Sequence, residues 1–124
     1  MPKTKLIFYQ DEKGRVPILK WLDSLPNKVQ TKCFVKLERL AQLGYEIRRP
    51  EADLLREKIY ELRINLQGIN YRILYFFYQN QAIVISHGLI KDKKVPPLEI
   101  EQAIKNKTKF QQNPEIHTYS QELI

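Results

Sequence analysis

The sequence predicts an α+β domain in which helices pack on one face of an antiparallel β-sheet, in the order β-α-α-β-β-β-α. Two patterns predict this class. Apolar residues recur at helical spacing between residues 17 and 43, whereas residues 58–89 contain apolar runs of strand length separated by short polar turns. The chain has 124 residues, of which 43% are hydrophobic, and this suits one hydrophobic core. We therefore expect a single domain over residues 1–109.

The first half of the chain is expected to form one strand and two helices. Residues 5–9 are a short apolar run, which predicts a strand. Pro17 suits the first turn of a helix, and Pro26 interrupts that helix. A second helix is expected after a connection at residues 24–27, and Gly44 is a typical C-terminal stop for it. We expect the two helices to lie antiparallel to each other.

The second half is expected to supply three strands. Residues 45–56 are predicted as a connection, and residues 58–66 then alternate between apolar and polar side chains. Residues 67–70 are predicted as a hairpin connection. Residues 71–78 are so rich in apolar side chains that we expect a central strand buried on both faces, and residues 82–89 predict a third strand.

The C-terminal part is expected to contain one more helix and a tail. Pro97 can open a helix that runs through about Lys107. Its acids lie in the first turn and its lysines near the end, which complements the helix dipole. Residues 110–124 lose all periodicity, so we expect a flexible tail that docks, if at all, on a partner.

Composition limits the location and the partners. Lys and Arg total 21 against 14 acids, and the resulting charge of +7 favours polyanions such as nucleic acid or the ribosome. Lys32 and Lys36, on the polar face of the second helix, are candidate contacts to RNA or the ribosome. No apolar run has the roughly 18–20 residues that a membrane helix needs. The single cysteine, Cys33, excludes an internal disulfide, and no metal-ligand or nucleotide-binding motif is found. We expect a cytoplasmic protein without a membrane, metal or cofactor.

Charged residues within the predicted strands are the main candidates for a functional site. Alternation places Glu61 and Arg63 side by side on the face opposite the apolar side chains of their strand. Arg72, in the next strand, can reach the same face. Since an unpaired guanidinium is costly to bury, two alternatives remain open. Arg72 forms a structural ion pair with Glu61, or it provides a cationic floor for a phosphate.

Further candidates lie at the end of the last strand. The loop that follows it contains Lys91, Lys93 and Lys94, which taken alone would be a solvated turn. His87 precedes this loop. It is either a satisfied residue of the core or its rim, or a proton-transfer group, since its ordinary pKa near 6.5 suits that role.

Several blocks of the sequence, in a fixed order, together resemble one known family. Residues 59–63 read Ile-Tyr-Glu-Leu-Arg and residues 71–76 read Tyr-Arg-Ile-Leu-Tyr-Phe. The other blocks are residues 17–26 and 87–96, with Glu99, Ile100 and Ala103. The order and spacing of the blocks, over about residues 5–107, resemble the phage-derived HigB-like branch of the RelE toxin superfamily. The resemblance implies a RelE-like fold and a toxin domain over residues 1–109.

The resemblance also implies an activity and partners. Toxins of this type belong to type II toxin–antitoxin systems, and they are ribosome-dependent, metal-free mRNA endonucleases that inhibit translation. A cognate antitoxin, commonly of helix-turn-helix type, neutralises them. The family pattern assigns Arg63 and Arg72 to binding and activating the scissile phosphate, and it assigns Lys93 and Lys94, with Lys91, to the basic rim.

The groups that transfer protons are less clearly assigned by the family pattern. Many relatives have a tyrosine or histidine shortly after the last strand, where this chain has Pro96 and Pro97. The candidates are therefore His87, Lys91 and Glu61, which is implied as a base or as an organiser of the arginines. The substrate 2′-hydroxyl would be the nucleophile. Two other functions remain open: a ParE-like gyrase inhibitor, and a non-catalytic basic module that binds RNA or the ribosome.

Overall fold

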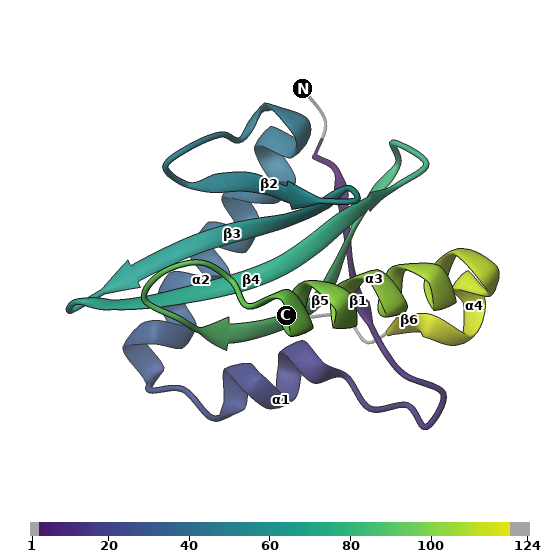
Figure 1. Cartoon of the computed structure of the whole chain (residues 1–124), viewed down its shortest axis with the longest axis horizontal. Coiled ribbons are helices and arrows are strands. Elements are labelled where there is room, and N and C mark those ends of the chain that lie inside the picture. The colour runs from purple at the N-terminus through teal and green to yellow at the C-terminus, as the bar shows by residue number, and fades with distance from the viewer. Residues whose placement is uncertain (1–2, 120–124) are drawn as a thin grey trace.

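Six strands form one mixed sheet in the computed structural model, which describes residues 3–119 (Figure 1). The elements, in chain order, are β1 (Lys5–Tyr9), α1 (Pro17–Asp23), α2 (Asn27–Leu43), the 3-10 helix η1 (Gly44–Glu46), β2 (Ala52–Arg56), β3 (Ile59–Leu66), β4 (Ile69–Tyr78), β5 (Ala82–Ile90), α3 (Pro97–Gln112), α4 (Pro114–His117) and β6 (Thr118–Tyr119). The strands lie in the order β2-β3-β4-β5-β1-β6. The predicted α+β class is confirmed. Across residues 3–119, every helix is too short or too polar to span a bilayer.

Both faces of the sheet are covered, because its central strands are apolar on both sides. Successive residues of a strand point to opposite faces. Ile73 and Tyr75 of β4 therefore join the core on the side of α1 and α2, which pack together on that face. Phe76 joins a second core on the other face, where the Phe110 ring of α3 lies 5.9 Å from it between ring centroids. The prediction that residues 71–78 form a central strand buried on both faces is confirmed.

Two features of the sheet differ from the prediction. β1 runs parallel to β5, so the sheet is mixed and not purely antiparallel. Residues 45–56 were expected to be a connection, yet they contain η1 and β2, which pairs antiparallel with β3. β2 is an edge strand in which Ala52 is buried while Leu54 is 52% exposed. An edge strand with so few buried side chains has only a weak apolar pattern.

The segment from residue 110, expected to be a flexible tail, is folded as far as residue 119. α3 continues to Gln112 and does not end near Lys107, and β6 pairs antiparallel with β1. His117 is buried, and its Nδ1 lies 2.8 Å from the carbonyl of Gln10, which is 107 positions earlier. Local periodicity cannot indicate contacts over such a separation. Residues 120–124 of the predicted tail lie outside the described residues.

The β3–β4 hairpin sets the register of the charged strands. Its turn consists of Gln67 and Gly68, with φ of 52° and 79°, where a four-residue connection over 67–70 was expected. Positive φ at both central residues is typical of the type I′ turn, whose twist matches that of the strands. The short turn places Arg63 of β3 directly opposite Arg72 of β4.

The single cysteine lies in the core between α2 and the sheet. Cys33 is fully buried, and burial raises the pKa of its thiol to about 11. The thiolate is the reactive form of a cysteine, so a buried thiol with a raised pKa is inert in the folded protein.

Candidate functional site

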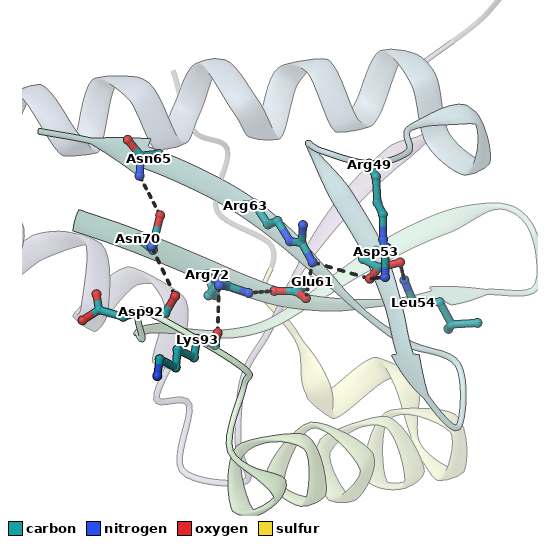
Figure 2. Close-up of polar contacts among 10 residues, drawn as sticks. All are labelled: Arg49, Asp53, Leu54, Glu61, Arg63, Asn65, Asn70, Arg72, Asp92 and Lys93. Atoms are coloured by element: carbon teal, nitrogen blue, oxygen red, sulfur yellow. Dashed lines mark hydrogen bonds and ion pairs between the residues drawn. The ribbon is translucent and has the colours of Figure 1, made fainter. Parts of the chain in front are cut away.

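Two arginines face each other across β3 and β4, and a carboxylate lies between them (Figure 2). Like charges directly opposite in a sheet repel each other. Glu61 offsets this repulsion, because its Oε1 forms an ion pair with Nη1 of Arg72 and its Oε2 lies 3.3 Å from Nη2 of Arg63. Strand alternation places all three side chains on the α3 side of the sheet, as the sequence predicts for Glu61 and Arg63.

The Glu61–Arg72 pair is buried. The exposed fractions of the side chains are 4% for Glu61 and 10% for Arg72. Arg72 also donates from Nη2 to the carbonyl oxygen of Lys93 at 2.9 Å, which ties the basic loop to β4. Of the two alternatives for Arg72, the structure therefore shows the ion pair, and little of its guanidinium remains open to a ligand.

Arg63 is the more accessible of the two arginines. Its side chain is 34% exposed, and its Nη2 is shared between Glu61 and Asp53, which is 3.5 Å away. Nε of Arg63 is buried without a partner among the described residues. In Figure 2 its other terminal nitrogen, Nη1, points away from both carboxylates. Arg63 is therefore a cation held in place by two acids with part of its donor capacity unused.

A third arginine, which lies just before the edge strand β2, completes this polar chain. Arg49 Nη2 donates to Oδ2 of Asp53 at 2.7 Å, and this hydrogen bond holds the pKa of Asp53 below its usual value. Asp53 of β2 is the cross-strand neighbour of Glu61 in β3. The two carboxylates thus alternate with three guanidiniums along one face of the sheet, and each acid has at least one arginine partner.

A cleft of about 550 Å³ opens above this chain of charges. Six cationic and two acidic side chains line it, together with apolar residues of β2 and α3. The charged residues are Arg49, Arg56, Arg63, Arg72, Lys93, Lys94, Asp53 and Glu61. We call this the α3-side cleft. Its excess of positive charge favours an anionic ligand.

A second cleft of about 390 Å³ lies between α2 and the turn-proximal ends of β3 and β4. Lys32 and Lys36 of α2 line it, as do Arg63 and Arg72, so the two clefts share both arginines. We call this the α2-side cleft. The structure thus brings together Glu61, Arg63 and Arg72 with the four lysines predicted to contact RNA or the ribosome, which are Lys32, Lys36, Lys93 and Lys94.

His87 and Lys91, predicted as catalytic, line neither cleft. A β-bulge in the β4–β5 pairing leaves Ser86 unpaired and turns both Ser86 and His87 toward α3. Nδ1 of His87 lies 2.8 Å from Ser86 Oγ, and its Nε2 lies 3.0 Å from Glu99 Oε1. His87 is therefore a satisfied residue beneath α3, which was one of its two alternatives, and the prediction that it reaches the site is wrong.

The buried position of His87 makes stability depend on pH. Burial lowers its pKa from 6.5 in the folded protein, so the unfolded chain binds the proton more readily. Above about pH 6.5, neutral His87 contributes fully to the free energy of unfolding. As the pH falls below this value, that free energy decreases by at most about 1.4 kcal/mol per pH unit. We expect His87→Gln to flatten the pH dependence of the free energy of unfolding between about pH 5 and 7. Urea denaturation measures this, and equal slopes in both proteins would contradict it.

Several residues of the site were missed in the sequence. Arg49, Asp53 and Arg56 belong to β2 or its approach, which was predicted as a connection. The alternation of Ala52, Asp53 and Leu54 is the signal that could have found them, because it places Asp53 on the face of Glu61. Among residues 3–119, no group of three or more His, Cys, Asp and Glu side chains has the arrangement of a metal site.

Comparison with known protein families places the two clefts within a family match. A family model described as "Phage derived protein Gp49-like (DUF891)" matches residues 20–108, which include both clefts and all the strands from β2 to β5. No curated protein matches the chain.

Proposed function

Because the chain belongs to the Gp49-like family of phage-derived proteins, we propose that it is the toxin of a type II toxin–antitoxin pair and cleaves messenger RNA on the ribosome. The family is of the RelE/HigB-like toxin type. The observation that supports RNA as the substrate is the α3-side cleft, in which the partly exposed Arg63 lies among five other cationic side chains. The proposed partner is a cognate antitoxin of helix-turn-helix type, and the proposed location is the cytoplasm.

The proposed reaction uses the 2′-hydroxyl of the RNA as the nucleophile. Its oxygen forms a bond to phosphorus, the bond from phosphorus to the 5′-oxygen breaks, and a 2′,3′-cyclic phosphate and a 5′-hydroxyl result. One proton leaves the 2′-hydroxyl and one reaches the 5′-oxygen. Arg63, Lys93 and Lys94 would stabilise the charge that develops on the phosphoryl oxygens, since preorganised cations need little rearrangement.

Glu61 and Arg72 have a different part in this proposal. Both oxygens of Glu61 are engaged by arginines, and Arg72 is buried, so neither is placed to exchange protons with the substrate. They are positioning residues: Glu61 fixes Arg63, and Arg72 fixes the loop that contains Lys93. Lys93 and Lys94 also line the cleft, and they are the proton-transfer groups in this proposal. The ribosome would supply the in-line geometry of the mRNA.

The experiment is to incubate the purified protein with ribosomes that hold a defined mRNA and to map new 5′-hydroxyl ends. We expect cuts in the RNA on the ribosome and none in DNA of the same sequence, which lacks the 2′-hydroxyl. Salt-dependent binding to ribosomes with the RNA left intact would instead favour the non-catalytic module. Trapped double-strand breaks by DNA gyrase would favour the gyrase inhibitor.

A further inference from the structure

We propose that the α2-side cleft binds the sugar–phosphate backbone of the same RNA next to the scissile linkage, so that one single strand crosses Arg63 and occupies both clefts. This inference rests on the proposed function and extends its site. It names the substrate as unpaired RNA with at least two phosphates in contact with the protein.

The first support is an excess of positive charge, which comes from the two lysines of α2 because the two arginines are paired with Glu61. Lys32, Lys36, Arg63 and Arg72 line the α2-side cleft, and Glu51 is the acid that lines it. Nε of Arg39, outside the cleft, already donates to the Glu51 carboxylate at 2.5 Å. Since Arg39 shares the charge of Glu51, the two lysines Lys32 and Lys36 give the cleft an excess of positive charge.

The second support is the burial and the bonding of Lys32 and Lys36. Both are half-buried, in contrast to Lys28 one turn earlier on α2, which is exposed. Lys32 donates to the carbonyl oxygen of Asn65, whereas Lys36 makes no hydrogen bond or ion pair within residues 3–119, and its charge adds to that of Arg39 in lowering the pKa of Glu51. Part of the aliphatic stem of each lysine is packed against the protein, which limits where its ammonium group can lie and places it at the cleft. The ordinary explanation of helix lysines as a solvated face fits Lys28 but not Lys36.

The third support is the continuity of the two clefts. Arg63 and Arg72 line both of them, so a chain that leaves the α3-side cleft over Arg63 enters the α2-side cleft directly. Each phosphate along such a path meets a new cation, first Lys93 or Lys94, then Arg63, then Lys36. A positively charged groove that follows the backbone is the usual site for a single strand.

The polar groups of the hairpin favour unpaired RNA over a duplex. Nδ2 of Asn65 donates to Oδ1 of Asn70 at 2.6 Å, which leaves the exposed Oδ1 of Asn65 as an acceptor at the cleft (Figure 2). A ribose 2′-hydroxyl or an exposed base edge can donate to it. A double helix presents its bases only within its grooves, whereas an unpaired strand can bring a base edge to Asn65 at the cleft.

The test uses an uncleavable probe, a single-stranded RNA of about twelve nucleotides with 2′-O-methyl sugars. Its Kd is measured as a function of salt for the wild type, for Lys36→Ala and for Lys28→Ala as the matched control. We expect Lys36→Ala to weaken binding several-fold and to lower the slope of log K against log salt by about 0.7, the value for one phosphate of a single strand. Lys28→Ala should leave both unchanged, and a duplex of the same sequence should bind less tightly.

Two results would overturn the inference. In the first, Lys36→Ala and Lys28→Ala have equal salt slopes, whereas the double variant Lys93→Ala/Lys94→Ala still binds the probe more weakly. That result would leave the α3-side cleft as the RNA site. The other is a wild-type protein that does not bind the probe, or binds the duplex as tightly. The proposed function is tested separately, by measuring whether the protein cuts mRNA on ribosomes. Since Lys36 has no bonded partner, Lys36→Ala should fold, and circular dichroism checks this.

Discussion

Glu61→Ala is expected to lower the free energy of unfolding by about 3–5 kcal/mol, because it leaves the guanidinium of Arg72 buried without a counter-charge. The side chain of Arg72 is only 10% exposed, so water cannot replace the lost carboxylate. Arg63 loses one of its two acids as well, but it is exposed enough to be hydrated. Urea denaturation of both proteins at neutral pH measures the difference.

Two further variants separate the charge from the packing. Glu61→Leu combined with Arg72→Met should restore most of the lost stability, since apolar pairs often replace buried ion pairs without cost. Glu38→Ala, which breaks the exposed pair between Glu38 and Lys3, should leave the stability almost unchanged. If Glu61→Ala cost less than about 1 kcal/mol, the pair would behave like a surface salt bridge and its burial would be of no consequence.

Arg63→Ala should reduce the rate of mRNA cutting on ribosomes by about 10²–10³-fold, the usual effect of removing one preorganised group that stabilises developing charge. Its effect on folding should be small, because Glu61 keeps Arg72 as a partner and the side chain of Arg63 is one-third exposed. Single-turnover measurement of new 5′-hydroxyl ends gives the rate directly.

The controls for Arg63→Ala test charge and shape. Arg15→Ala removes an exposed guanidinium that lines neither cleft and should cut at the wild-type rate. Arg63→Lys keeps the charge but loses the planar fork, so it should retain an intermediate rate. Cutting at the full rate by a folded Arg63→Ala protein would place the reaction elsewhere in the molecule.

The order of the main elements and the position of Glu61 and Arg63 on one face could be predicted from the sequence, because both depend on local periodicity. The dense apolar run of β4 predicted burial on both faces, and α3 provides the second cover. The parallel pairing of β1 with β5 and the return of β6 to β1 could not be predicted in this way. They join distant parts of the chain whose local sequences do not indicate a neighbour.

The site was predicted in part for similar reasons. Alternation alone placed Glu61 beside Arg63, and the two-residue turn fixed the register that brings Arg72 opposite. The position of His87 depends on a bulge that shifts the alternation of β5 by one residue, and no residue type in that strand marks it. Asp53 was missed because a charged, half-exposed edge strand resembles a loop.

Cys33 provides the protein with an internal reporter of its own opening. It is the single thiol of the chain and lies between α2 and the sheet, so a maleimide can label only molecules in which that interface has separated. Intact-mass counting of labelled molecules would then report the open fraction of every variant above, in mixtures and at low concentration. A loss of RNA cutting could thus be assigned either to a change in the chemistry of the cleft or to a lower fraction of folded protein.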